Sequence, residues 1–141
     1  MDSVVLAAVD LAQSSFGGRV LKTAKAMADL KGLQLAVVTV LPDYGNSFVG
    51  SFFADTQSHE MVERTQKALH EFVRMTIGDD SSVQHVILMG SAYQEVLKTA
   101  DKLNASLIVI GANKPDVTDF LIGPNAARIA RHAVCSVYIC R

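Results

Sequence analysis

The segment with the clearest capacity for chemistry is "GANKPDVTDFLIGPN", residues 111–125. It follows a hydrophobic run that predicts a strand, and its last glycine, Gly123, precedes a helical pattern. Backbone N–H groups in a glycine loop that leads into a helix favour negative charge, because the first-turn donors are unsatisfied and the helix dipole is positive there. The loop therefore predicts a polyphosphate site. A plain loop that caps the helix is the competing interpretation, and spacing alone leaves both open.

The rest of the sequence contains no familiar catalytic motif. It has neither the G-x-x-x-x-G-K-[ST] P-loop nor the G-x-G-x-x-G dinucleotide fingerprint. The segment "HEMVE", residues 59–63, lacks the second histidine of a helix-borne zinc site. His70, His85 and His132 have no sequence-local partners for metal binding or acid–base chemistry, so we expect structural or surface roles for them. We assign no catalytic residue and no metal ligand, and expect a protein that is not an enzyme.

The composition is typical of one globular domain that spans residues 1–141. Hydrophobic residues make up 50% of the chain and charged residues 19%, which excludes disorder. The formal net charge is -1 and the basic residues are spread along the chain, so nucleic acids are poor candidates as partners. The apolar run from Val4 to Val9 is too short for a signal peptide or a membrane span. We therefore expect a cytoplasmic protein without membrane insertion.

Five short runs rich in valine, isoleucine and leucine predict strands. They cover residues 3–9, 33–41, 83–89, 106–112 and 136–140. Four of the five are nearly continuous in their apolar character, as expected for strands that are buried on both faces of a parallel sheet.

Helical periodicity fills the intervals between these strands. The four predicted helices begin at Ser14 or Ser15, near Met61, at Ser91 with Gln94 in capping-box spacing, and at Gly123 and Pro124. Gly32 and Gly78 are positioned to end the first two helices. Alternating strands and helices predict a single α/β domain in which helices cover both faces of a parallel sheet. Ligands of such sheets bind beyond the carboxyl ends of the strands, where strand order reverses.

Residues 42–56, "PDYGNSFVGSFFADT", form the longest predicted connection. Its four aromatic residues predict a surface loop that packs on the body of the protein. A lid, or a contact surface for a partner, is the alternative.

The chain resembles the universal stress protein family, and particularly its F-type branch. The resemblance rests on an opening "VVLAAVDLAQSS", a second strand that closes in "VTVLP", Gly90 after the third strand, and the final "LIVIGANKPDVTDFLIGPNAARIARHAVCSVYICR". It covers nearly the whole chain. It implies a five-stranded parallel sheet in the order 3-2-1-4-5, the Rossmann-like fold of the adenine nucleotide alpha hydrolase type.

The resemblance also implies a nucleotide site. Nucleotide-binding members hold adenine at the ends of their first two strands, and a G-x-x-G-x9-G-[ST] loop holds the ribose and phosphates. The positions that match here are Ala8, Asp10 and Val40 for adenine, and Gly111, Asn113, Lys114, Gly123, Pro124, Asn125 and Ala126 for the loop and the helix start.

Three departures from that motif are present. Lys114 stands in place of the second glycine, the next interval is one residue short, and Pro124 replaces the serine or threonine. Pro124 removes a hydroxyl and an N–H, and each hydrogen bond to a charged group contributes about 1.5–3 kcal/mol. The loss of one would weaken binding by about tenfold to a hundredfold. The side-chain amide of Asn125 and the N–H groups of Asn125 and Ala126 can still meet a phosphate, so we expect a working loop of reduced affinity.

The resemblance implies a regulatory stress-response protein that binds ATP or another adenine nucleotide, with or without Mg²⁺. It also implies a homodimer formed through the last strand, "SVYIC". One alternative is an interaction module that has lost nucleotide binding. Another is a slow ATP hydrolase, for which Asp116 and Asp119 are the local candidates to bind a metal ion.

Overall fold

The computed structural model describes residues 3–41, 51–112 and 124–141, together with their side chains except those of 13–14 and 51–58. The elements are β1 (Val4–Ala8), η1 (Leu11–Gln13), α1 (Ser14–Lys31), β2 (Gln34–Leu41), α2 (Ser51–Ile77), β3 (Gln84–Met89), α3 (Ala92–Lys102), β4 (Ala105–Gly111), α4 (Pro124–His132) and β5 (Ser136–Cys140). None of the helices described combines the length and the apolar character that a membrane span requires.

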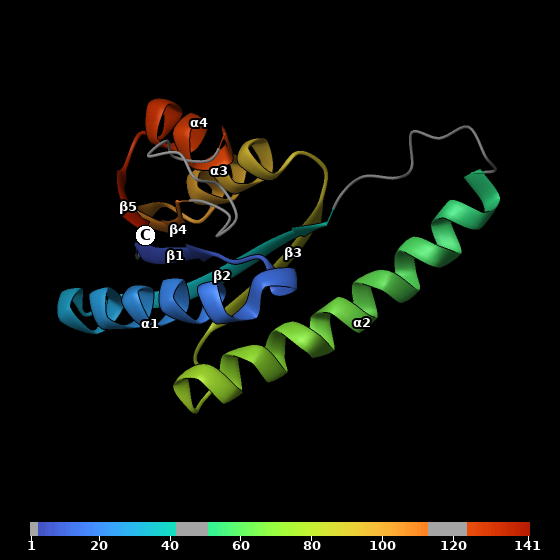
Figure 1. The fold of residues 1–141 in the computed structure, drawn as a ribbon, viewed down its shortest axis with the longest axis horizontal. Helices are drawn as coiled ribbons and strands as arrows, with labels where there is room; N and C mark the ends of the chain where they lie inside the picture. Colours follow the sequence, from blue (N-terminus) through green and yellow to red (C-terminus); the bar gives the residue numbers. More distant parts are fainter. Residues whose placement is uncertain (1–2, 42–50, 113–123) are drawn as a thin grey trace.

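The five strands form one parallel sheet in the order β3-β2-β1-β4-β5, which confirms the predicted fold. Helices α1 and α2 cover one face of the sheet, and α3 and α4 cover the other (Figure 1). Strand β1 therefore has a neighbouring strand at each edge and a helix layer on each face. This double burial explains the continuous apolar character of the run that forms β1.

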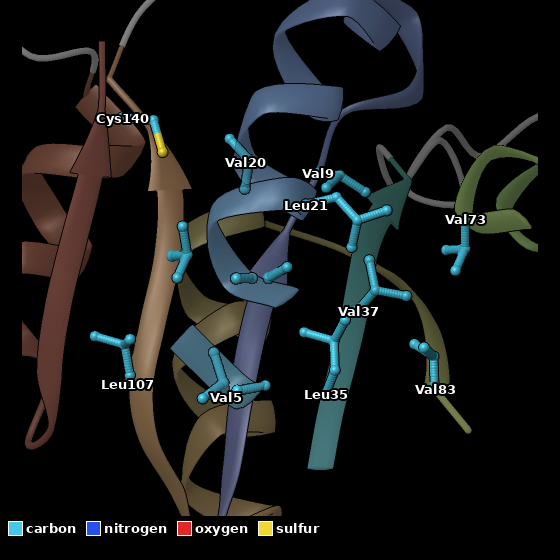
Figure 2. Close-up of a cluster of buried hydrophobic side chains, with 14 of the residues drawn as sticks. Val5, Val9, Val20, Leu21, Leu35, Val37, Val73, Val83, Leu107 and Cys140 are labelled. Carbon is cyan, nitrogen blue, oxygen red and sulfur yellow. The ribbon is translucent and has the colours of Figure 1, made fainter. Parts of the chain in front are cut away.

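Each face of the sheet has its own hydrophobic core. Val5 and Ala7 of β1 join the cluster beneath α1 and α2, whereas Val4 and Leu6 join the cluster beneath α3 and α4. Figure 2 shows the first cluster, in which Val20 and Leu21 of α1 lie over side chains of the sheet.

Two predicted helix ends are confirmed and one helix start is corrected. Gly32 (φ 67°) follows α1 and Gly78 (φ 87°) follows α2, both in the left-handed region that favours glycine. Helix α2 begins at Ser51, so the prediction that residues 51–56 belong to a loop is wrong. Residues 42–50 of that loop lie outside the described part of the chain.

The start of α2 differs from the prediction because the prediction relied on apolar periodicity, whereas a helix can also extend through residues that lack it. The apolar pattern becomes helical only near Met61, whereas the chain has no glycine or proline between Gly50 and Gly78. A helix that has nucleated can extend through such a stretch, since each further residue adds a hydrogen bond. The amino-terminal part of α2 accordingly extends beyond the sheet (Figure 1).

The predicted capping box of α3 is also wrong. Ser91 is the N-cap residue, but its side chain makes no capping hydrogen bond. The amide of Gln94 instead donates to the hydroxyl of Tyr93 at 3.3 Å. The first turn closes through the backbone, because the N–H of Glu95 donates to the carbonyl of Ser91 at 3.0 Å.

A polar cluster joins the carboxyl-terminal end of α2 to the edge strand β3. The rings of His70 and His85 are stacked, with centroids 3.6 Å apart and an interplanar angle of 18°. Nδ1 of His70 lies 2.8 Å from Oδ2 of Asp80. Burial lowers the pKa of His85, with a further contribution from His70, and the hydrogen bond with His70 lowers the pKa of Asp80. The turn after α2 thus brings together residues for which the sequence showed no local partner.

We expect the stability of the protein to fall as the pH is lowered below 6.5, the ordinary pKa of histidine. In that range the unfolded chain takes up a proton at residue 85 that the folded protein resists, so protonation favours unfolding. Asp80 acts in a lower pH range. Because its pKa is lowered in the folded protein, its ionised form stabilises the fold above pH 3.8, and this contribution is lost as the pH falls below that value. Urea denaturation of wild type and His85→Phe at pH 7.5, 6.0 and 5.0 should show a shallower decline for the variant.

His132→Phe is the control for this comparison, because His132 is an exposed histidine on α4. Its decline should follow that of the wild type. A decline in His85→Phe as steep as the wild type's would show that His85 does not carry the effect.

Candidate functional site

The candidate site lies at the carboxyl ends of β1, β2 and β4. Strand order reverses at β1, whose neighbours are β2 on one edge and β4 on the other, and ligands of α/β sheets bind at such a point. Ala8 ends β1, Val40 lies one residue before the end of β2, and Gly111 ends β4. The topology thus places these three predicted residues together at the carboxyl-terminal end of the sheet.

Strands β1 and β2 separate at their carboxyl ends. The last backbone bond between them runs from the N–H of Val9 to the carbonyl of Val38, at 3.0 Å. The hydroxyl of Thr39, a buried side chain, donates to the carbonyl of Val9 at 2.9 Å. Strand β2 continues to Leu41, whose carbonyl accepts the N–H of Gly90 from beyond β3 at 2.9 Å.

This separation leaves the backbone of Val40 open. Alternate residues of a parallel strand turn their N–H and C=O groups to the same neighbour. Because the carbonyl of Val38 faces β1 and that of Leu41 faces β3, the N–H and C=O of Val40 face the side where β1 has ended. Within residues 3–41, 51–112 and 124–141, neither group has a backbone partner. A donor and an acceptor therefore stand side by side at the strand end.

Asp10 stands beside this opening with its carboxylate exposed to solvent. Its Oδ1 accepts the N–H of Ala12 at 2.9 Å, which fixes the start of η1. Its second oxygen has no hydrogen-bond partner in the part of the chain that the structure describes. Ala8, the small residue at the end of β1, is half-buried against the α3 and α4 side. The carboxylate is thus held by one oxygen and can accept a hydrogen bond with the other.

Gly111 has a structural reason to be glycine. A Cβ atom at this position would lie 2.6 Å from Cε1 of Phe16, a residue in the first turn of α1. The next residue, Ala112, is buried, and its N–H donates to the carbonyl of Cys140 at 2.7 Å. Packing against Phe16 therefore favours glycine at the first position of the loop, and its presence is not by itself evidence of phosphate binding.

Helix α4 begins at Pro124, the position where proline suits a helix. Pro124 and Asn125 are exposed, while Ala126 is 3% exposed and packs in the core. The N–H groups of Asn125 and Ala126 belong to the first turn, so they have no acceptor within the helix. Two donors without an acceptor inside the helix and one exposed amide side chain therefore stand at this helix start.

Five further candidate residues lie outside the described part of the chain. They are the loop residues Asn113, Lys114 and Gly123 and the two acids Asp116 and Asp119.

One nearby cation was missed by the sequence analysis. Arg128 lies one turn after Pro124 on α4, and its guanidinium carbon is 5.0 Å from the centre of the Tyr93 ring of α3. This cation–π contact links the two helices on the same face of the sheet. Arg128 follows Pro124 by four residues, so both lie on the same side of α4 on neighbouring turns. This spacing is the sequence signal that could have indicated Arg128.

The chain was compared with known families and curated proteins. The model described as "Universal stress protein family" matches residues 2–141. Universal stress protein G of Shigella flexneri is 29% identical over 147 residues, which cover 100% of each chain. Universal stress protein A homolog 1 of Coxiella burnetii is 32% identical over 136 residues, which cover 94% of this chain and 92% of the relative. The F-type branch within the family stays a prediction.

Solved structures show the same fold. Universal stress protein UspA from Lactobacillus plantarum superposes with a TM-score of 0.71 at 20% identity, covering 99% of this chain and 97% of that one. A universal stress protein from Archaeoglobus fulgidus in complex with dAMP gives 0.65 at 23% identity, covering 99% and 98%. A universal stress protein in complex with cAMP gives 0.68 at 16% identity, covering 99% and 97%. By the match over nearly its whole length, the chain belongs to the universal stress protein family.

Proposed function

We propose that this protein is a cytoplasmic regulator of the stress response that binds ATP or another adenine nucleotide and acts as a homodimer. The observation that carries the proposal is the open backbone of Val40 at the point where strand order reverses. Adenine presents a ring nitrogen that accepts a hydrogen bond next to an amine that donates one. The N–H and C=O of one residue match that pair, and pockets that fix a ligand by a few such groups are typical of small-molecule sites.

Asp10 and Ala8 fit the same ligand. The free oxygen of Asp10 can accept a hydrogen bond from the amine of adenine or from a ribose hydroxyl. The methyl group of Ala8, which is half-buried, leaves room for a flat ring beside the end of β1. The residues that would hold the base are therefore Ala8, Asp10 and Val40.

The start of α4 is the proposed phosphate end of the site. Asn125 and Ala126 offer N–H groups that have no acceptor inside the helix, where the helix dipole is positive, and Asn125 adds a side-chain amide. Arg128 adds a positive charge one turn later. Gly111, Asn113, Lys114 and Gly123 complete the proposed loop, and Mg²⁺, where present, would be bound through the phosphates.

Two structural neighbours support the choice of ligand. They are complexes with cAMP and with dAMP, both adenine nucleotides. Their sequence identities of 16% and 23% are low, so the likeness concerns the fold. What they add to the proposal is that this fold accommodates an adenine nucleotide in other members of the family. We assign no catalytic residue, and the proposed role is regulation by binding.

Asp10→Asn should weaken the binding of ATP by at least about tenfold, since it replaces a charged acceptor oxygen with an amide group. Asparagine keeps an oxygen at the Oδ1 position, so the hydrogen bond to Ala12 and the start of η1 should survive. Isothermal titration calorimetry of wild type and variant measures the change. Asp101→Asn, at an exposed position of α3, is the matched control. Wild-type protein that gives neither heat nor a melting shift with millimolar ATP would refute nucleotide binding.

Pro124→Ser should tighten the binding of ATP by about tenfold to a hundredfold, because it restores an N–H and adds a hydroxyl at the helix start. The binding of adenosine, which has no phosphate, should not change. Pro124→Ala restores the N–H alone and should give part of the gain. Equal changes for ATP and adenosine, or none for ATP, would show that the helix start does not meet the phosphates.

Strand β5 is the proposed dimer contact. It lies at the edge of the sheet, where the open backbone of a strand can pair with another chain. Tyr138 is 45% exposed at its centre, and Val137 and Ile139 beside it are half-buried. A two-fold axis beside this strand would pair it with its own copy and cover these side chains.

Tyr138→Glu should convert the dimer into a monomer, because it places a carboxylate opposite its own symmetry mate in the paired strands. Size-exclusion chromatography with light scattering gives the mass directly. Leu30→Glu, on an exposed position of α1, is the control and should remain dimeric. A variant that elutes with the mass of the wild type would exclude β5 as the interface.

A further inference from the structure

We propose that His70, Asp80 and His85 form a binding site for a divalent transition-metal ion, zinc in particular. The site lies between α2 and β3, near the amino-terminal end of β3, whereas the nucleotide site proposed above lies at the carboxyl ends of the strands. It shares no residue with that site, so the inference does not depend on nucleotide binding.

The geometry of the three side chains is the first support. One potential ligand atom from each of the three residues lies within 4.8 Å of the other two. Nδ1 of His70 and Oδ2 of Asp80 are already 2.8 Å apart. In a tetrahedral zinc site with bonds of about 2.0–2.2 Å, the ligand atoms are separated by roughly 3.4 Å. Binding of one ion by all three atoms therefore requires side-chain rotations that change these separations to about 3.4 Å and turn the two stacked rings relative to each other.

An unsatisfied nitrogen is the second support. Nε2 of His85 is buried and has no hydrogen-bond partner in the part of the chain that the structure describes. Buried polar atoms are nearly always satisfied, and one that is not calls for an explanation such as an ion. A metal ion is a partner that a lone pair on this nitrogen can bind.

Metal binding also sets the protonation states of the three side chains. Metal binding requires neutral histidine and ionised carboxylate. On binding, the ion takes the place of the proton between Nδ1 of His70 and Oδ2 of Asp80. The neutral ring of His70 then carries its single proton on Nε2, so no net proton is released.

The set of ligands indicates which ion fits. Two imidazole nitrogens and one carboxylate oxygen suit Zn²⁺, Co²⁺ or Ni²⁺, whereas Ca²⁺ and Mg²⁺ prefer oxygen alone. The side chain of His70 is 38% exposed and that of Asp80 is 21% exposed, so water can reach the ion as a fourth ligand. A groove of about 710 Å³ along α2 leads to His70, and its charged lining residues are Glu63, Lys67, Glu71 and Arg74. The charges of these four residues balance, so the attraction for a cation comes from Asp80.

An ion at this position would join α2 to β3. His70 lies on α2, Asp80 in the turn that follows, and His85 on the edge strand. The stacked rings and the hydrogen bond hold these segments together without an ion. The ion would replace that hydrogen bond with bonds to all three residues, and these bonds would exist only in the folded state. Binding should therefore raise the melting temperature.

The test uses the full chain without an affinity tag, freed of metal with a chelator and studied without nucleotide. Zn²⁺ should bind at one ion per chain by calorimetry and raise the melting temperature, and Mg²⁺ should do neither. Co²⁺ should give the visible bands of a four-coordinate site with nitrogen and oxygen ligands. His85→Phe, which keeps a flat ring in the stack, and Asp80→Asn should each weaken Zn²⁺ binding by at least about tenfold. His132→Phe, on the exposed side of α4, should bind as the wild type does.

Several results would overturn the proposal. They are the absence of a Zn²⁺ effect on the wild type, an undiminished effect in both His85→Phe and Asp80→Asn, and a thiolate-to-cobalt charge-transfer band. The last result would assign the ion to the free cysteines Cys135 and Cys140. Asp80→Asn alters the half-exposed partner of the cluster, so it keeps the test decisive if His85→Phe does not fold.

Discussion

The central strand β1 ends before its neighbour β2 does, and the candidate nucleotide site follows from that difference in length. The hydroxyl of Thr39 donates to the carbonyl of Val9, the atom that would otherwise accept the next N–H of β2. This bond satisfies the end of β1 and leaves the N–H and C=O of Val40 without a strand partner in the described structure. Both groups need a partner from outside the described residues, such as water or a ligand, since peptide groups without a partner are costly. A flat ring with adjacent donor and acceptor atoms meets that requirement.

Much of the fold could be predicted because its signals are local. Continuous apolar runs mark strands buried on both faces, and Gly32 and Gly78 mark helix ends where the backbone needs a positive φ. Strand order came from the family resemblance, because periodicity says which residues are buried but not which strands are neighbours. The start of α2 at Ser51 could not be predicted from periodicity, since a helix that extends beyond the sheet has no need of an apolar stripe there.

Some residues of the candidate sites could likewise be predicted from the sequence, and others could not. Val40 acts through its backbone, so its residue type carries no signal, and only the family resemblance pointed to it. Gly111 did carry a signal, but its close packing against Phe16 favours glycine there for a reason unrelated to phosphate. The cluster of His70, Asp80 and His85 had no recognisable spacing, because its members come from a helix, a turn and a strand. Their meeting depends on how the chain reverses after α2, which is a tertiary property.

The two proposed sites are joined by the β2–β3 ladder, and its rigidity determines how they can affect each other. Six residue pairs, from Ala36 with Gln84 to Leu41 with Met89, connect the level of His85 to the level of Val40. Such a ladder fixes both positions but has a single arrangement in this structure. Coupling between sites requires an element with two arrangements that both ligands bias, and a continuous path between them is not enough. The ladder therefore gives the two sites a common frame, and any regulatory link between nucleotide and metal must come from an element that can move relative to it.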